Sequence, residues 1–135
     1  MVLFISEQME EPMNNTQKKV KELYKTLLDA EEHLFPPKRQ RLNAPKEKGV
    51  YIILSPRGKV LHVGNTPRAK EGVHQRLRNH MNGLSSFAHQ YLEGDGDWLR
   101  GRCKFKFIVE RNPKLRAYLE AYAIGNLCPE HIGAE

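Results

Sequence analysis

The sequence predicts a small α+β domain in which helices cover an antiparallel sheet. An apolar, β-branched stretch at 50–54 is followed by turn residues and a second short strand at 59–63, the pattern of a β-hairpin. Segments with apolar residues at helical i, i+3, i+4 spacing stand before and after this hairpin. The alternating stretch 104–110 adds a third strand, and the order helix, hairpin, helices, strand, helix gives the α+β class.

The composition is that of a globular protein with a basic surface. The 135 residues suit one domain with one modest core, and 39% of them are apolar. The 22 basic residues exceed the 16 acidic ones and give a net charge of +6, which favours nucleic acid as a partner. No apolar run approaches a membrane span, and the two cysteines form no zinc or disulfide motif. We therefore expect a cytoplasmic protein that does not enter a membrane.

The N-terminal third is predicted to lie outside the sheet. Apolar residues at helical spacing indicate an amphipathic helix over 14–34, which the proline pair at 36–37 stops. The segment 38–48 carries five basic residues against one acidic residue, and we interpret it as a solvated basic linker. The predicted division is a helix and linker, 1–45, and a folded domain, 46–135.

Three further helices are predicted within the folded domain. Glycine stops, serine caps and a proline at a first helical position define their ends. The expected ranges are 73–82, 85–92 and 113–125.

The hairpin carries two candidate site residues, Tyr51 and His62, one on each strand. If Ser55 and Gly58 close a two-residue loop, the two side chains face each other. If the loop has three residues and Gly58 sits in a bulge, the register moves by one and they point to opposite faces. The turn sequence favours the bulge, so the hairpin alone does not place both in one site.

Arg76 and His80 are i and i+4 on the predicted helix 73–82 and therefore lie on the same side of it. An arginine offers a planar fork of donors that suits a phosphate, and a histidine can donate, accept or transfer a proton. A solvated basic helix face would show the same pattern.

Glu120 lies within a second apolar stripe of the predicted helix 113–125, a stripe that includes Ala117 and Ala121. A helix that is apolar on much of its circumference is expected to be well buried. A buried carboxylate needs a cation, a hydrogen-bond network or a metal ion. The alternative to a functional role is a structural ion pair with Arg116 or Arg100.

Phosphodiester hydrolysis requires a positioned water, a base that takes its proton, and positive charge near the phosphate oxygens. A divalent metal on a carboxylate, together with an arginine, supplies that charge. A set of tyrosine, histidine, arginine and glutamate meets these needs without a serine or cysteine nucleophile.

The order of these motifs resembles the GIY-YIG nuclease superfamily. In that family the two triplets lie on the two strands of a hairpin, an arginine opens the next helix, and a glutamate lies on a later helix. The resemblance spans roughly residues 47–132. Its segments are Gly49-Val50-Tyr51, His62-Val63-Gly64, Arg76-Leu77-Arg78-Asn79-His80, and Glu120-Ala121-Tyr122-Ala123-Ile124 through Pro129.

The resemblance implies a three-stranded antiparallel sheet flanked by helices, and a nuclease that depends on Mg²⁺ or Mn²⁺. It implies that Glu120 ligates the metal and that Tyr51 orients or deprotonates the attacking water. Arg76 would steady the scissile phosphate, and His80 would assist at the phosphate or the water. It also implies that the hairpin residues converge. The expected nucleic-acid contacts are Lys59, Asn65, Arg68, Lys70 and Arg78.

Two positions depart from the family pattern. His62 replaces the second tyrosine, and Ile132 stands where an asparagine often follows the proline. An imidazole at residue 62 can hold the water or phosphate, or act as the base.

The leading hypothesis is an endonuclease or nickase that cuts DNA, with RNA as the alternative substrate. The rivals are a nucleic-acid-binding module on a degenerate nuclease scaffold, and a regulatory protein. In the second rival, helix 14–34 docks a partner protein or a second copy of the chain.

Overall fold

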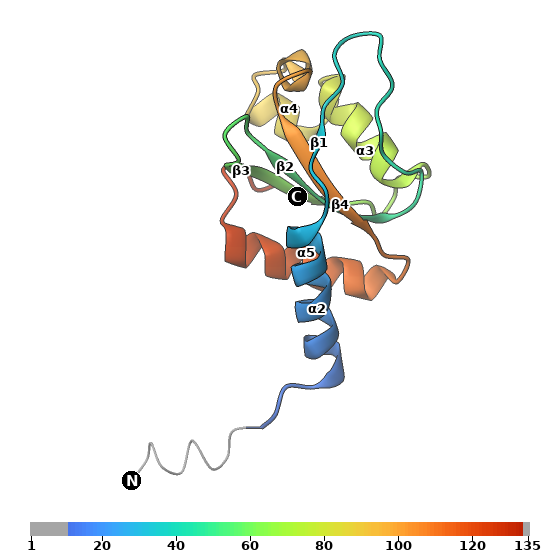
Figure 1. The fold of residues 1–135 in the computed structure, drawn as a ribbon, viewed down its shortest axis with the longest axis vertical. Coiled ribbons are helices and arrows are strands. Elements are labelled where there is room, and N and C mark those ends of the chain that lie inside the picture. Colours follow the sequence, from blue (N-terminus) through green and yellow to red (C-terminus); the bar gives the residue numbers. More distant parts are fainter. Residues whose placement is uncertain (1–10, 134–135) are drawn as a thin grey trace.

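The computed structural model describes residues 11–133, which form an antiparallel sheet between two layers of helices (Figure 1). The predicted α+β class is confirmed, although the sheet has four strands rather than three, in the order β1-β4-β2-β3. Residues 1–10 of the predicted N-terminal region lie outside the described residues. The elements are α2 (Asn15–Asp29), β1 (His33–Leu34), β2 (Gly49–Leu54), β3 (Val60–Asn65), α3 (Gly72–Met81), α4 (Ser86–Gln90), the 3₁₀ helix η1 (Gly96–Leu99), β4 (Lys104–Val109) and α5 (Pro113–Leu127).

Strand β2 is the centre of the molecule, and all six of its residues are buried. Its continuous apolar run is explained by helices on both faces of the sheet. Val50, Ile52 and Leu54 join a cluster with residues of α2 and α5. Tyr51 and Ile53 join a second cluster with residues of α3, α4 and η1. Alternation along one strand therefore feeds two separate cores.

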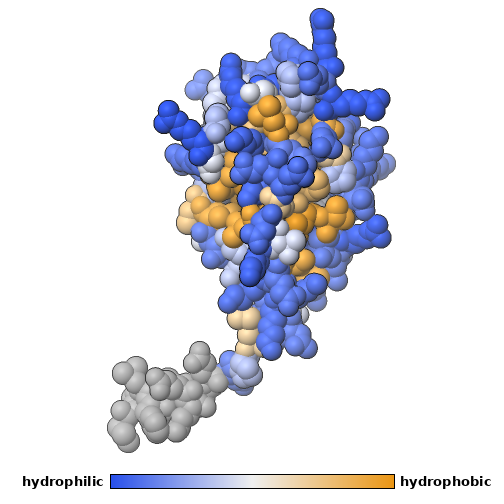
Figure 2. All heavy atoms as spheres, viewed as in Figure 1, coloured by the Kyte–Doolittle hydropathy of each residue, from blue (hydrophilic) through white to orange (hydrophobic). Residues whose placement is uncertain are grey.

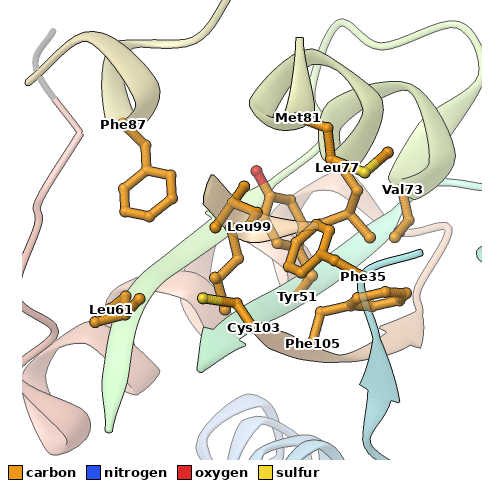
Figure 3. Packing of buried hydrophobic residues seen from close by; sticks show 11 residues of the cluster. Phe35, Tyr51, Leu61, Val73, Leu77, Met81, Phe87, Leu99, Cys103 and Phe105 are labelled. Atoms are coloured by element: carbon orange, nitrogen blue, oxygen red, sulfur yellow. The ribbon is translucent and has the colours of Figure 1, made fainter. Parts of the chain in front are cut away.

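The figures show the two sides of this arrangement. In Figure 3, Tyr51 rises from β2 among the side chains of the second cluster, with its hydroxyl oxygen toward the helices. Figure 2 shows that apolar residues gather in a band at the level of α5, while hydrophilic side chains cover most of the rest of that face. No helix within residues 11–133 is long and apolar enough to cross a lipid bilayer.

The fourth strand lies where the sequence predicted the last turn of the first helix. Helix α2 ends at Asp29, because Ala30 adopts an extended backbone conformation. Residues of β1 instead pair with β4, and the ring of His33 stacks on that of Phe105 with centroids 5.3 Å apart. Phe35 follows and is fully buried. Contacts with β4, which helical spacing does not reveal, therefore override the local helical pattern.

Helix α2 packs against α5 of the same chain, and this contact covers its apolar side. Leu27 is fully buried in the cluster with α5, and the ring of Tyr24 meets that of Tyr122 edge-on at 5.1 Å. The surface that the regulatory alternative assigned to a partner is thus largely occupied within the chain.

The hairpin contains the predicted three-residue loop and a second irregularity that the sequence did not predict. The amide of Ser55 donates to the carbonyl of Lys59, and Gly58 adopts φ +91°. Leu54 then pairs with Val60, but Ile53 pairs with His62, so Leu61 is an extra residue in β3. A one-residue shift moves all later side chains to the other face. The bulge therefore compensates for the one-residue change of register that the three-residue loop introduces.

The consequence is that Tyr51 and His62 lie on the same face of the hairpin. Tyr51 is opposite Gly64, and His62 is two residues before Gly64 on β3. The ring centroids of Tyr51 and His62 are 6.2 Å apart.

The segment after α5 runs beside β3. Cys128 ends α5 in the left-handed conformation with φ 46°. The amides of Glu130 and His131 then donate to the carbonyls of Val60 and Leu61, at 3.2 and 2.9 Å. The carbonyl of the bulge residue is thus used to hold the C-terminal segment at the edge of the sheet.

Candidate active site

One cleft of about 730 Å³ gathers the residues that the sequence motifs singled out. It lies between β3, the loop that follows it, α3, α5 and the C-terminal segment. Its lining includes Tyr51, His62, Arg76 and Glu120. His80 is fully buried behind the cleft, where it contacts two of the lining residues, Tyr51 and His62.

Tyr51 is fully buried, and its side chain forms part of the wall of the cleft. Its hydroxyl lies 2.7 Å from Nε2 of His80, whose Nδ1 lies 2.6 Å from Oγ of Ser85. Ser85 also accepts the amide of Ala88 as the cap of α4. Three residues from β2, α3 and the start of α4 therefore form one hydrogen-bonded row that fixes the tyrosine hydroxyl.

Burial controls the protonation of this row. Burial raises the pKa of Tyr51 to about 12, and the nearby Arg76 guanidinium, which also hydrogen-bonds to Tyr51, partly offsets the rise. Burial and the neighbouring His62 and Arg76 hold the pKa of His80 well below its ordinary value. Both side chains are therefore neutral near pH 7 and act through hydrogen bonds rather than charge.

The glycines of the two triplets are required by close approach. A Cβ atom at Gly64 would lie 2.2 Å from Cζ of Tyr51, and one at Gly49 would lie 2.1 Å from the carbonyl oxygen of Ile108. Both distances are far inside van der Waals contact. Gly64 is thus the residue that allows the ring of Tyr51 to cross over β3 toward the cleft.

His62 is 5% exposed and is held by its neighbours. Its Nδ1 lies 3.1 Å from Nδ1 of His131, and its ring stacks on Phe87 with centroids 4.9 Å apart. Burial first, and then the neighbouring His131 and Arg76, lower its pKa to about 3, although a hydrogen bond to the His131 backbone opposes the shift. His62 is therefore a neutral imidazole in the free protein.

Glu120 lies at the margin of the cleft rather than within a buried apolar face. Helix α5 buries one side only, because Ala117 and Ala121 are exposed to solvent. The prediction of a helix buried around much of its circumference is therefore wrong, although Glu120 itself is partly buried and lines the cleft. Glu120 is therefore a partly buried carboxylate at the edge of the cleft.

The two arginines named as possible structural partners of Glu120 both contact other groups. Arg116 is 3% exposed, and its guanidinium donates to the carbonyls of Glu110 and Arg111, both at 2.9 Å. Arg100 forms an ion pair with Asp97 at 2.9 Å. Two other arginines, Arg68 and Arg76, line the cleft with Glu120, and Arg76 is the one beside Tyr51.

The predicted nucleic-acid contacts fall into two groups. Asn65 and Arg68 line the cleft. Lys59 forms an ion pair with Glu130, and Lys70 is exposed on the loop before α3. Arg78 forms an ion pair with Glu71 at 3.1 Å and lines a separate groove on another side of α3.

Sequence reasoning missed three polar residues around the site, Ser85, Gln90 and His131. Ser85 or Ser86 was expected to cap a helix, but the bond of Ser85 to His80 has no signal in the sequence. His131 lies beyond the last motif and reaches His62 only because the C-terminal segment pairs with β3. Such contacts depend on tertiary structure and not on spacing.

Comparison with protein-family models, curated proteins and solved structures gives no significant match to this chain.

Proposed function

We propose that the protein is a divalent-metal-dependent endonuclease or nickase that hydrolyses phosphodiester bonds in DNA. The supporting observation is that one cleft is lined by the strand, helix and carboxylate residues of all four motifs. These residues are Tyr51, His62, Arg76 and Glu120. They come from four different elements, so their meeting is a property of the fold and not of one amphipathic segment.

In this proposal Arg76 binds the scissile phosphate. Its guanidinium lies beside the Tyr51 hydroxyl, so a phosphate on Arg76 would be next to that hydroxyl. The fork of guanidinium donors suits two phosphate oxygens and stabilises the charge that develops on them during attack. Arg68, at the exposed side of the same cleft, adds positive charge for the approaching strand.

The two hairpin residues orient and deprotonate the attacking water. Tyr51 stays protonated, because its pKa is about 12, and its hydroxyl orients the water. His62 is neutral in the free protein, and it accepts the proton of the water as the new P–O bond forms, because the negative charge of a bound phosphate would favour the protonated imidazole. The P–O bond to the leaving strand breaks, and the leaving oxygen takes a proton from solvent. His80 and Ser85 act indirectly, by fixing the tyrosine hydroxyl.

The donor set of the cleft fits Mg²⁺ or Mn²⁺. No group of three or more His, Cys, Asp and Glu able to hold a metal occurs in the described part of the chain, and Glu120 is the carboxylate among the cleft-lining residues. Mg²⁺ keeps several waters and is commonly held by one or two carboxylates plus substrate phosphates. Glu120 would hold such an ion, which when bound neutralises phosphate charge and acidifies water.

Relaxation of supercoiled plasmid tests the proposal. Wild-type protein with Mg²⁺ or Mn²⁺ is expected to produce nicked or linear DNA, and EDTA should stop the reaction. Glu120→Gln removes the charge with little change of shape and should lower the rate by at least about 100-fold. The matched control is Glu22→Gln on the exposed side of α2, which should cut like wild type.

Two outcomes would contradict parts of this proposal, the first the hydrolase activity and the second its location in the cleft. If wild type and Glu120→Gln show the same absence of cutting on duplex, single-stranded DNA and RNA, the hydrolase proposal fails. If Glu22→Gln is impaired as much as Glu120→Gln, the loss does not report on the cleft.

A nucleic-acid-binding module is the second candidate, and the nature of residue 132 favours it. Ile132 lines the cleft but offers no ligand atom to a metal ion, which leaves Glu120 as the one carboxylate among the described residues there. Arg68 and Arg76 can bind phosphate without a metal. This candidate predicts binding of DNA that weakens steeply with salt, without cleavage in any metal. Binding that does not change between low and moderate salt contradicts it.

A further inference from the structure

His131 connects the cleft to Gln90 through a hydrogen-bonded chain that no sequence motif indicated. Oε1 of Gln90 lies 2.8 Å from Nε2 of His131, and Nδ1 of His131 lies 3.1 Å from Nδ1 of His62. His131 is 7% exposed, so its ring is largely shielded from water. The backbone of His131 also makes a hydrogen bond with the imidazole of His62, so both the ring and the main chain of His131 contact this side chain.

The amide carbonyl at the start of this chain sets the direction of its hydrogen bonds. A carbonyl oxygen only accepts, so His131 carries a proton on Nε2. His131 is neutral, because burial lowers its pKa, and its Nδ1 therefore presents a lone pair. His62 must then donate from Nδ1. A neutral His62 with a proton on Nδ1 has an unprotonated Nε2.

We propose that His131 is a positioning residue, which holds His62 in the Nδ1–H tautomer and leaves Nε2 as the proton acceptor available to the cleft. The catalytic consequence rests on the proposed nuclease function, whereas the tautomer is a property of the free protein.

The backbone and the ring contacts of His62 also serve this arrangement. The carbonyl of Leu61, the bulge residue, accepts the amide of His131 at 2.9 Å. The same bulge turns His62 toward the face of Tyr51. Phe87 stacks on the imidazole of His62 with an interplanar angle of 21°. One irregularity in β3 thus places His62 and anchors the residue that orients it.

The tautomer can be measured directly by NMR on protein labelled with ¹⁵N-histidine at pH 7. Protonated and unprotonated imidazole nitrogens differ strongly in ¹⁵N chemical shift, and His62→Gln and His131→Gln assign the two rings. We expect His62 to carry its proton on Nδ1 and His131 on Nε2. A wild-type protein in which His62 carries its proton on Nε2 overturns the inference.

Variants test whether His131 and Gln90 cause the tautomer. Gln90→Leu removes the acceptor at an exposed position, so the fold should survive and His62 should show a mixture of tautomers. Gln90→Glu keeps an acceptor and should preserve the Nδ1–H form. Gln40→Leu, at an exposed loop residue, is the matched control and should leave the wild-type spectrum. An unchanged His62 tautomer in Gln90→Leu contradicts the proposed cause.

Cutting assays on the same samples separate this inference from the proposed function. We expect Gln90→Leu to lower kcat several-fold with little change in KM, while Gln90→Glu restores it. If wild type cuts DNA and Gln90→Leu cuts equally well despite a changed tautomer, the positioning role is wrong. If wild type has the expected tautomer and does not cut, the nuclease proposal fails while the assignment of the tautomer stands.

Discussion

The two faces of the sheet differ in what they bury. The buried cluster under α2 and α5 consists only of leucine, isoleucine, valine and alanine side chains. The face under α3 and α4 buries Tyr51, His62 and His80, with Ser85 and His131 beside them. Buried polar groups cost free energy unless they are hydrogen-bonded, and those on this face are bonded to one another.

This contrast teaches how the chain divides its tasks. A single strand, β2, sends alternate residues to an apolar face that supplies stability and to a polar face that presents the candidate site. Polar networks in a low-dielectric interior fix the orientation of each member. The hydrogen bonds therefore hold the side chains of the polar face in fixed orientations. The apolar face stabilises the fold but contributes no residue to the network. Substitutions on the two faces should have different signatures.

The largest expected effect on stability is on the apolar face. Leu27 is fully buried, so Leu27→Ala should lower the free energy of unfolding by about 2–5 kcal/mol, through lost burial and a residual cavity. The remaining folded protein should cut DNA at the wild-type rate. Urea unfolding at pH 7 measures the change. Leu84→Ala, at a leucine 68% exposed, is the matched control and should be nearly neutral.

The proposed difference between the two faces is contradicted if Leu84→Ala lowers the free energy of unfolding as much as Leu27→Ala. It is also contradicted if folded Leu27→Ala protein loses its cutting activity.

A smaller loss of stability is expected from Gly64→Ala, because the ring of Tyr51 packs directly against this glycine. Gly64→Ala would place a methyl 2.2 Å from the ring of Tyr51, and we expect a loss of about 1–3 kcal/mol together with slower cutting. Gly125→Ala on α5 meets nothing within 4 Å and should stabilise the protein slightly, since alanine favours helices. Thermal unfolding compares the two. Equal effects from both substitutions would show that close packing at Tyr51 is not the cause.

Acid should weaken the polar face. The folded-state pKa of His62 is about 3, below the value of about 6.5 in an unfolded chain, so the unfolded state binds more protons between these values. Stability is therefore full above about pH 6.5 and falls as pH drops toward 3. From His62 alone we expect a loss on the order of 1–2 kcal/mol between pH 7 and pH 5, and His80 acts in the same direction.

Urea unfolding at the two pH values measures this loss. His62→Gln should reduce the dependence and leave the part due to His80, whereas His89→Gln on the exposed side of α4 should keep all of it. A wild-type stability that is constant from pH 7 to pH 5 contradicts a buried neutral His62.

The smallest expected effect concerns the rim of the cleft. Arg68 is exposed and lines the cleft, so Arg68→Gln should weaken DNA binding modestly and reduce the slope of log affinity against log salt by about 1. Fluorescence anisotropy with a labelled duplex measures both. Lys18→Gln on α2 is the comparison, and a change as large as that of Arg68→Gln would mean that binding is spread over the whole surface.

Local patterns were sufficient to predict most of the elements. Turn residues, caps and apolar spacing predicted the hairpin, α3, α4, β4 and α5 close to their observed bounds. They did not predict β1, because pairing with β4 and stacking of His33 on Phe105 are contacts between distant segments. Spacing also overestimated the burial of α5, where Ala117 and Ala121 are apolar but exposed.

The candidate site was predicted in its parts but not in its assembly. The motifs identified Tyr51, Arg76 and Glu120, which line one cleft. The hairpin turn left the relation of Tyr51 to His62 open, and a bulge at Leu61 settles it. The bulge depends on the packing of both strands and on hydrogen bonds to the C-terminal segment. These contacts cannot be inferred from the turn sequence.

The most direct test of the account is whether the cleft residues act as one catalytic unit. Single-turnover cleavage of a labelled duplex in Mn²⁺ should be measured for wild type, Tyr51→Phe, Glu120→Gln and the double variant. Residues that serve one step lose activity non-additively, so the double variant should be no slower than the slower single variant. Losses that multiply, or variants that cut as fast as wild type, would contradict a shared active site at Tyr51 and Glu120.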